Sequence, residues 1–309
     1  MIQDVLNKAY EHGKMSLKDG KVATYIPELS KANPSHLGAS VITPDGEHFH
    51  VGEWQRKFTI QSISKTISLI LALKKAGYTQ VFSKVGLEPT GDSFNSIVKL
   101  ETKTARPLNP MINAGAIAVT SCIPGKNPFE DILALTRKLC MNDEIELNKS
   151  VYLSEKKAGM RNRSMAYWMK SENILEKDVE ETLDTYFRMC SMNVTTKDLA
   201  SYALILANNG VNPMTDERLI EGWIVRIVKT FMLTCGMYDG SGEFAIKVGI
   251  PSKSGVGGGI LSPVERSMGI AVYGPALDER GNSVGGMRML EHMSGAMNLH
   301  LFSGCDIKK

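Results

Sequence analysis

The chain of 309 residues is 43% hydrophobic and 22% charged, which is typical of a globular protein. Its 36 basic and 33 acidic residues leave a formal net charge of +3, so charge gives no reason to expect nucleic acid or an anionic membrane as a partner. No apolar stretch is long enough for a membrane helix, and the polar N-terminus lacks the apolar core of an export signal, so we expect a cytoplasmic protein.

The N-terminal part predicts a helix followed by a β-hairpin. The first thirty residues show a helical pattern that breaks at Tyr25-Ile26-Pro27. Residues 37–42 predict a strand, and residues 47–51 predict the strand that returns beside it. The four residues between them, 43–46 (TPDG), predict a turn, because proline presets φ and glycine accepts a positive φ.

The middle of the chain predicts mostly helices. After Ser62 the apolar residues recur at helical spacing, and long segments of this kind continue to about residue 232. The segment Thr195-Thr196-Lys197-Asp198 resembles a capped helix start, in which side-chain oxygens satisfy free N–H groups. The clearest helical segments are residues 132–139, 166–169, 196–208 and 221–230.

The last third predicts a return to strands and then a closing helix. Short apolar segments separated by turn residues occur at residues 244–248, 258–261 and 268–272. A loop follows at residues 278–283, and the methionine-rich segment 284–302 predicts the closing helix.

A helical block that interrupts a sheet indicates an α/β fold in which an all-α domain is inserted into a sheet domain. We therefore expect a discontinuous sheet domain of residues 1–61 plus 233–309 and a helical domain of residues 62–232. The active site should lie at their junction.

The cysteines and histidines give no sign of a metal site or a disulfide framework. The five cysteines are odd in number and never form a C-x-x-C pair, and no H-E-x-x-H pattern accompanies the six histidines. The sequence therefore predicts reduced thiols, no bound metal and no cofactor. The cysteines are Cys122, Cys140, Cys190, Cys235 and Cys305.

Ser62 and Lys65 form an S-x-x-K pair at the start of the helical block. Residues three apart on a helix share a face, so the lysine amine can approach the serine hydroxyl and take its proton. Burial or nearby positive charge would lower the lysine pKa enough for this role. The pattern alone is weak, since it occurs by chance about once or twice in a chain of this length and composition, and a plain helix start with an exposed lysine is the structural alternative.

A second element strengthens the pair. Lys253-Ser254-Gly255 lies between strands of the returning sheet and resembles the K-T-G element of serine β-lactamases and penicillin-binding proteins, which keep S-x-x-K where the sheet meets the first helix. That resemblance implies an antiparallel sheet flanked by N- and C-terminal helices. The third element of that superfamily is missing, because S-D-N does not occur; the S-x-N triplets begin at Ser93, Ser171 and Ser191.

The chain as a whole is similar to the serine-dependent glutaminases. The similarity is carried nearly end to end by ordered segments, which is far more specific than any one motif. These segments are residues 25–29 (YIPEL), 61–65 (QSISK), 109–117 (NPMINAGAI), Ser154-Glu155 with Arg161-Asn162, Tyr186-Phe187 before Cys190-Ser191, and residues 235–239 (CGMYD), 253–260 (KSGVGGGI) and 281–284 (GNSV).

This resemblance implies a reaction and a role for each matching residue. L-glutamine would be hydrolysed to L-glutamate and ammonia through a γ-glutamyl ester on Ser62, with Lys65 as the activating base. Tyr238 would pass the proton to the leaving ammonia, and the backbone N–H groups of Ser62 and Val256 would form the oxyanion hole. Tyr25 and Tyr186 would line the pocket, and Asn113, Glu155 and Asn162 would bind the amino-acid end. The resemblance also implies a homo-oligomer, either a dimer or a tetramer.

The substrate assignment agrees with the chemistry of free glutamine. Its α-ammonium needs an anion such as Glu155, and its α-carboxylate needs amide or hydroxyl donors such as Asn113 and Asn162. A peptide glutamine would leave these groups unpaired at a cost of about 1–3 kcal/mol each.

Other interpretations remain open at this stage. The S-x-x-K and Lys-Ser-Gly elements also fit a penicillin-recognising hydrolase or D,D-peptidase, although the missing export signal counts against one. A glutaminase-like fold could also serve as a non-enzymatic binding module. The glycine run from Gly255 to Gly259 could resemble a phosphate loop, but no Walker pattern surrounds it.

Overall fold

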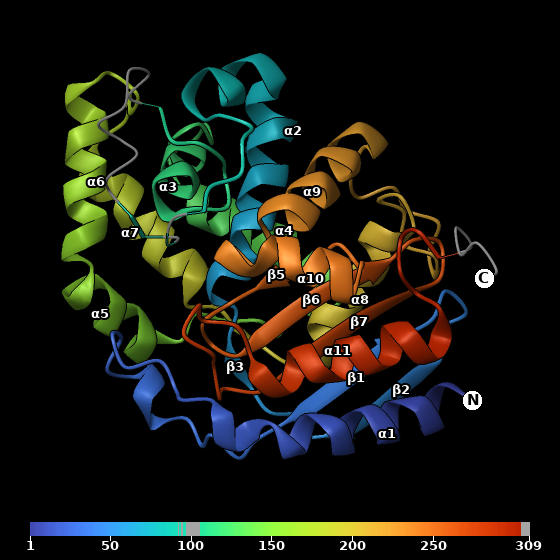
Figure 1. Ribbon diagram of the computed structural model, residues 1–309. Helices are drawn as coiled ribbons and strands as arrows, with labels where there is room; N and C mark the ends of the chain where they lie inside the picture. The colour runs from blue at the N-terminus through green and yellow to red at the C-terminus, as the bar shows by residue number, and fades with distance from the viewer. Residues whose placement is uncertain (92, 94, 97–105, 304–309) are drawn as a thin grey trace.

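The computed structural model describes residues 1–91, 93, 95, 96 and 106–303. Its centre is an antiparallel sheet of five strands in the order β2-β1-β7-β6-β5 (Figure 1). The strands are β1 (Gly38–Ile42), β2 (His48–Gly52), β5 (Lys253–Ser254), β6 (Gly259–Val264) and β7 (Met268–Tyr273).

Helices cover both faces of this sheet. The first and last helices, α1 (Ile2–Met15) and α11 (Val284–Met297), pack side by side on one face, and α8 (Thr196–Ala207) packs on the other (Figure 1). Strand β7 shows why both layers form: Ile270 joins the core with α1 and α11, whereas Ala271 joins the core with α8. The predicted sheet with flanking terminal helices is thus confirmed.

The contact between α8 and β7 depends on a glycine. A Cβ atom at Gly269 would lie 2.0 Å from the carbonyl oxygen of Ala200 and 2.3 Å from the amide nitrogen of Leu204. Only glycine permits so close an approach of two backbones. Although α8 falls within residues 62–232, it covers the sheet, and the division into two domains stays a prediction.

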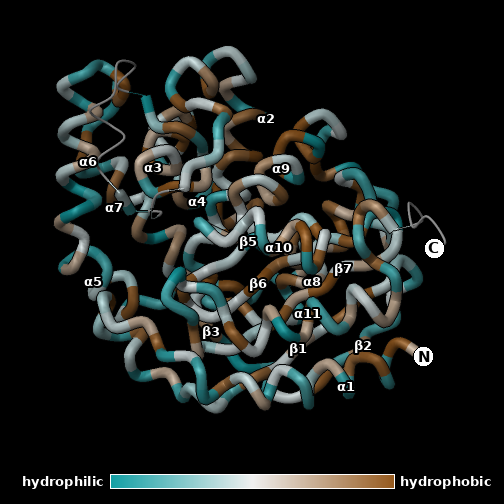
Figure 2. The backbone as a smooth tube through the Cα atoms, viewed as in Figure 1, coloured by the Kyte–Doolittle hydropathy of each residue, from teal (hydrophilic) through white to brown (hydrophobic). Residues whose placement is uncertain are grey.

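Except for α10 (Ser241–Lys247), which packs into the core with α1 and α11, the remaining helices form the layer beyond α8, with α2 running through its interior (Figures 1 and 2). Hydrophobic segments gather in α2 and the central strands, whereas α6 is mostly hydrophilic (Figure 2). A two-stranded sheet of β3 (Phe58–Thr59) and β4 (Asn193–Val194) joins the segment before α2 to the segment before α8. The helices are α2 (Ser64–Lys84), α3 (Asn113–Ser121), α4 (Pro128–Cys140), α5 (Lys149–Ala158), α6 (Met160–Ser171), α7 (Val179–Cys190), α9 (Gly222–Cys235) and α10 (Ser241–Lys247).

Several local predictions are confirmed. The hairpin turn closes with a hydrogen bond of 2.9 Å from Gly46 N–H to the Thr43 carbonyl, and Gly46 has the expected positive φ of 86°. Thr195 and Asp198 form a complete capping box at the start of α8. Two helices end earlier than predicted, α1 at Met15 and α11 at Met297, where Asn298 adopts the left-handed conformation that terminates a helix.

The strand predicted at residues 244–248 is wrong, because this segment lies in α10 and its C-cap. Phe244 and Val248 are buried in the core with α1 and α11, whereas Ile246 is 80% exposed. In a strand residues 244, 246 and 248 would share one face, so an exposed Ile246 between two buried residues fits the period of a helix and not that of a strand. Gly249, with a positive φ of 65°, then ends the helix with a hydrogen bond from its N–H to the Phe244 carbonyl.

Candidate active site

Ser62 lies in a short 3-10 helix (Gln61–Ile63) that leads directly into α2. Only 7% of its surface is exposed. The preceding Gln61 has φ of 49°, a left-handed conformation that a residue with a side chain rarely adopts. Such strain concentrates at functional sites, so the backbone marks Ser62 as a candidate nucleophile.

Lys65 lies in the first turn of α2 and is fully buried. Its Nζ donates hydrogen bonds to the Met111 carbonyl at 3.1 Å and to Oδ1 of Asn113 at 2.7 Å. Burial disfavours the charged amine and lowers the pKa of Lys65 to about 8. About a tenth of the amine is therefore neutral at pH 7, far more than for an ordinary lysine, and the neutral form is the one a general base requires.

Tyr238 lies beside Ser62, in a 3-10 turn (Tyr238–Gly240) after α9. Its hydroxyl hydrogen-bonds the Ser62 side chain and the backbone of Val256, and it donates to the Ser254 carbonyl at 3.3 Å. Burial raises the pKa of Tyr238, so its hydroxyl keeps its proton at neutral pH. The structure thus brings Ser62, Tyr238 and the Lys-Ser-Gly strand together.

Lys253 is the second fully buried lysine of this region. Its Nζ donates to the carbonyls of Gly236 at 3.0 Å and Ser254 at 2.6 Å, and it lies 4.6 Å from the centre of the Tyr238 ring. Burial, and then the neighbouring Lys65, lower the pKa of Lys253 well below its usual range. Lys253 therefore contacts the ring of Tyr238 and stabilises the end of β5.

The glycines after Lys253 let the β5–β6 loop approach the serine. A Cβ atom would lie 2.8 Å from the Ile60 carbonyl oxygen if placed on Gly255, and 2.5 Å from the Thr59 carbonyl oxygen if placed on Gly257. Close approach of two backbones explains this glycine run, and a phosphate loop is not needed to account for it.

Ser62 opens into a cavity of about 80 Å³. Asn113, at the start of α3, donates from Nδ2 to Oδ1 of Asn162 on α6 at 3.0 Å. Glu155 on α5 is buried, and burial raises the pKa of its carboxyl group to about 8. The predicted residues that line this cavity are Tyr25, Ser62, Asn113, Glu155, Asn162 and Tyr186.

The two pocket tyrosines differ in exposure. Tyr186 is 3% exposed on α7, whereas Tyr25 is 53% exposed at the mouth of the cavity. Burial of the Tyr25 hydroxyl, together with the nearby Glu155, nevertheless raises its pKa well above the usual value. Tyr25 thus lines the cavity while about half of its surface stays exposed, and its hydroxyl keeps its proton at neutral pH.

Among the lining residues that sequence reasoning did not assign to the site are Gln61, Arg161 and Cys190. The Gln61 side chain hydrogen-bonds Glu155, Cys190 contributes a buried thiol beside Tyr186, and Arg161 is exposed at the rim. Each belongs to one of the segments that resemble the serine-dependent glutaminases. Their nearness in sequence to Ser62, Asn162 and Tyr186 could therefore have identified them.

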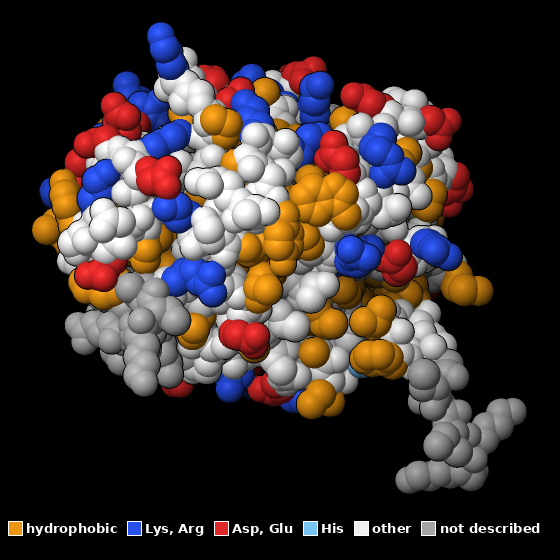
Figure 3. All heavy atoms as spheres, turned by 90° about the horizontal axis from the view of Figure 1, so that it is seen from above, with side chains coloured by type: hydrophobic (Ala, Val, Ile, Leu, Met, Phe, Trp, Pro, Cys, Tyr) orange, Lys and Arg blue, Asp and Glu red, His pale blue; other side chains and the backbone are white. Residues whose placement is uncertain are grey.

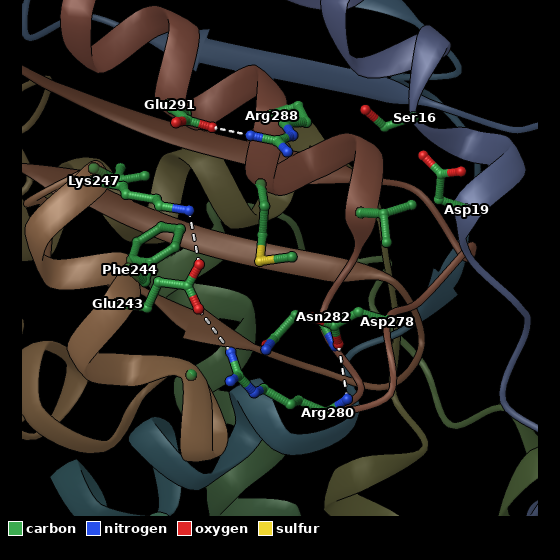
Figure 4. Close-up of a pocket in the computed structure, with 14 residues that line it drawn as sticks. Ser16, Asp19, Glu243, Phe244, Lys247, Asp278, Arg280, Asn282, Arg288 and Glu291 are labelled. Atoms are coloured by element: carbon green, nitrogen blue, oxygen red, sulfur yellow. Dashed lines mark hydrogen bonds and ion pairs between the residues drawn. The ribbon is translucent and has the colours of Figure 1, made fainter.

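The larger pockets among the described residues do not combine a buried serine with a buried lysine. A pocket of about 220 Å³ between α10, α11 and the end of α1 is lined mainly by charged residues, of which Lys247, Arg280 and Arg288 pair with Glu243 or Glu291 (Figure 4). It contains no buried serine next to a lysine. Among the described residues, no group of three or more His, Cys, Asp or Glu side chains is placed to hold a metal ion, and no helix has the length and apolarity to span a membrane.

The fold and site together define a class of protein with a β-lactamase-like fold, in which a buried serine begins the first helix after the opening strands and a Lys-Ser-Gly strand faces it. Residues 20–302 match the family model for glutaminase. The chain therefore belongs to the glutaminase family, whose members are amidohydrolases.

Named relatives agree along the whole chain. A glutaminase of Clostridium tetani is 55% identical over 306 residues, which cover 98% of this chain and all of the relative. A solved structure of a probable glutaminase, YbaS, is 38% identical with a TM-score of 0.93 and covers 98% of each chain. The glutaminase YbgJ of Bacillus subtilis, solved as a covalent complex with 5-oxo-L-norleucine, is 39% identical with a TM-score of 0.89 over 98% of this chain and all of that one.

Proposed function

We propose that this protein hydrolyses free L-glutamine to L-glutamate and ammonia through an ester between Ser62 and the γ-carbonyl. One observation carries the proposal. The Ser62 side chain, hydrogen-bonded to Tyr238, lines a small cavity that is also lined by the buried carboxyl group of Glu155. The nucleophile and a partner for an α-ammonium group thus share one enclosed space.

In the acylation step, neutral Lys65 takes the proton of Ser62 while the serine oxygen attacks the γ-carbonyl carbon. The backbone N–H groups of Ser62 and Val256 stabilise the negative charge that develops on the carbonyl oxygen. In the free protein the backbone of Val256 hydrogen-bonds the Tyr238 hydroxyl beside Ser62, which supports this assignment. Tyr238 then gives a proton to the departing nitrogen, the C–N bond breaks, and ammonia leaves. The proton held by Lys65 passes to the tyrosinate, so that Lys65 is neutral and Tyr238 is protonated again before deacylation.

In the deacylation step, a water molecule takes the place of ammonia. The same base removes its proton, the hydroxide attacks the ester carbon, and the C–O bond to Ser62 breaks as the serine regains its proton. L-glutamate leaves, and Lys65 and Tyr238 return to their starting protonation states.

The cavity supports recognition of both charges at the amino-acid end. Glu155 faces the α-ammonium, and the amide groups of Asn113 and Asn162 face the α-carboxylate together with the hydroxyls of Tyr25 and Tyr186. Its enclosure supports the rejection of peptide-linked glutamine, because a peptide group would leave Glu155 unpaired.

The covalent complex of the Bacillus subtilis relative supports a nucleophilic mechanism. To test the mechanism in this protein, 6-diazo-5-oxo-L-norleucine is added, and the adduct is located by peptide mass spectrometry. We expect one adduct, on Ser62, with loss of ammonia release from glutamine. An adduct on any other residue contradicts the role of Ser62. Rapid nitrocefin hydrolysis without ammonia release would instead favour the penicillin-recognising alternative.

Two further parts of the proposal concern the whole molecule. The family resemblance implies a homo-oligomer, and Figure 3 shows exposed hydrophobic side chains gathered near the centre of the face seen from above, which is compatible with an interface. Light scattering after gel filtration distinguishes a monomer from a dimer or tetramer. The proposed cytoplasmic location is tested by fractionation of the native host.

A further inference from the structure

The backbone of Tyr238 adopts an unusual conformation. Its φ is 55°, in the left-handed region that an aromatic residue seldom occupies. This conformation turns the ring from the end of α9 toward the β5 strand, where the hydroxyl meets Ser62 and Ser254. The place of the hydroxyl therefore depends on what fixes the two peptide groups that flank the Tyr238 Cα.

A buried serine holds the peptide group on one side. Oγ of Ser241 accepts a hydrogen bond of 3.0 Å from the Met237 N–H and donates one of 2.7 Å to the Tyr238 carbonyl. Ser241 is 6% exposed and does not line the Ser62 cavity. It thus fixes the peptide group after Tyr238 without reach to a substrate.

A buried asparagine from a distant segment holds the other peptide group. Nδ2 of Asn282 donates a hydrogen bond of 3.2 Å to the Met237 carbonyl, which belongs to the peptide before Tyr238. Asn282 is 1% exposed, and its own N–H donates to Oδ1 of Asp278 at 2.8 Å. It lies between α10 and the start of α11, on the floor of the pocket in Figure 4, and outside the Ser62 cavity.

From these contacts we infer that Ser241 and Asn282 are positioning residues that hold Tyr238 in its left-handed conformation, so that its hydroxyl reaches the leaving ammonia. The inference rests on the proposed function, because it needs Tyr238 as the proton donor to ammonia. It predicts that losing either contact impairs proton delivery to the leaving group, beyond any effect on folding.

Two substrates with different leaving groups separate these effects. L-glutamine needs a proton on its departing nitrogen, whereas the γ-p-nitrophenyl ester of L-glutamate releases a phenolate that needs none. Rates are measured at pH 7, with the spontaneous loss of the ester subtracted. General acid catalysis typically contributes about 10²–10⁴-fold, so Tyr238→Phe should lose at least about 100-fold more kcat/KM on glutamine than on the ester.

Asn282→Ala and Ser241→Ala should show the same selective loss, of about tenfold or more. Ser241→Thr keeps the hydroxyl and should keep the wild-type ratio of the two substrates. Asn282→Asp keeps the size of the side chain but loses the donor, and so replaces Asn282→Ala if that variant does not fold. Ser294→Ala is the matched control, because it removes a buried hydroxyl of α11 that donates to the Val248 carbonyl at 2.6 Å, away from Tyr238.

The outcomes distinguish this inference from the proposed function. One outcome is that Tyr238→Phe loses more kcat/KM on glutamine than on the ester, while the variants of Ser241 and Asn282 lose kcat/KM equally on both substrates or on neither. In that case the positioning role is wrong and the proposed function stands. An equally selective loss in Ser294→Ala also overturns the positioning role. If the wild type releases no ammonia, or Tyr238→Phe shows no selectivity, the proposed role of Tyr238 fails first, and the inference fails with it.

Discussion

Lys65 and Asn113, which are 48 residues apart in the chain, are joined by a hydrogen bond of 2.7 Å from the lysine Nζ to the asparagine Oδ1. The other end of the same amide donates to Asn162 at 3.0 Å. One asparagine thus connects the candidate base with the wall of the substrate cavity. While Lys65 is protonated its Nζ can only donate, so the amide keeps its acceptor Oδ1 toward the lysine. The protonation of Lys65 is therefore sensitive to changes at this position.

The first prediction concerns the Ser62–Lys65 pair. Ser62→Ala and Lys65→Ala should each reduce kcat for ammonia release by about 10⁴-fold or more, and the double variant should lose little more, because residues that act as one unit are not additive. A coupled glutamate or ammonia assay measures the loss, and thermal unfolding checks the fold. Additive losses in the double variant would argue against a single Ser–Lys unit.

Lys74→Ala is the matched control for that experiment. Lys74 lies on the same helix as Lys65, but it is partly exposed, and its Nζ contacts the Leu219 carbonyl and Glu221. Its replacement should leave kcat near the wild-type value. A comparable loss in Lys74→Ala would show that the assay reports damage to α2 in general.

The second prediction concerns pH. A base must be neutral to act, and burial places the pKa of Lys65 at about 8, so kcat should rise as the pH increases through about 8. Glu155 must be ionised to receive the substrate, and its pKa is also raised to about 8. Because kcat/KM reports the free protein, it should rise more steeply than kcat over the same range.

Asn113→Asp tests which group controls the kcat profile. A carboxylate within hydrogen-bond distance of Nζ favours the charged amine and raises the pKa of Lys65. The rising limb of kcat should then move to higher pH, with lower activity at pH 7. A limb that stays in place would show that a group other than Lys65 controls kcat.

The third prediction concerns substrate recognition by Glu155. A hydrogen bond to a charged group contributes about 1.5–3 kcal/mol, so Glu155→Gln should raise KM for glutamine by about 10- to 100-fold. Glutaramate, which is glutamine without the α-ammonium, has no cation to lose and should be hydrolysed equally by both proteins. Steady-state kinetics with the two substrates measure the difference. An equal loss on glutaramate would show that Glu155 contributes to the chemical step rather than to recognition of the ammonium.

The sequence predicted the architecture well where local patterns and tertiary packing agree. The hairpin turn at Gly46 and the capping box at Thr195 use local hydrogen bonds, so the residue types alone identify them. The strand prediction at residues 244–248 was wrong because a short apolar segment fits either a strand or a helix. Only packing against α1 and α11 determines which of the two forms.

The candidate site was predictable as a set of residues but not as a geometry. The family resemblance named Tyr238 and Glu155, whereas the left-handed backbone of Tyr238 and the contact from Gln61 to Glu155 depend on segments far apart in the chain. The pKa of Lys65 likewise depends on complete burial, which the four-residue spacing cannot express. Such properties are set by the assembled core and need the structure.

The last prediction tests whether the β5–β6 loop must lie against the serine segment. In Gly257→Ala the new Cβ would lie 2.5 Å from the Thr59 carbonyl oxygen, so the loop must shift away from Ser62. A shift of about 1 Å at a catalytic site can cost about 100-fold in rate, and overpacking typically costs about 1–3 kcal/mol of unfolding free energy. We therefore expect kcat/KM for glutamine to fall by about 100-fold, with a lower thermal midpoint.

Gly295→Ala provides the comparison for Gly257→Ala. Gly295 lies in α11, and a Cβ atom there meets nothing within 4 Å. Alanine in a helix is more stable than glycine by about 0.5–1 kcal/mol, so this variant should keep wild-type kinetics with an equal or higher thermal midpoint. Wild-type kcat/KM in Gly257→Ala would mean that the loop adjusts without moving the Val256 N–H, and that close packing of this loop does not position the proposed oxyanion hole.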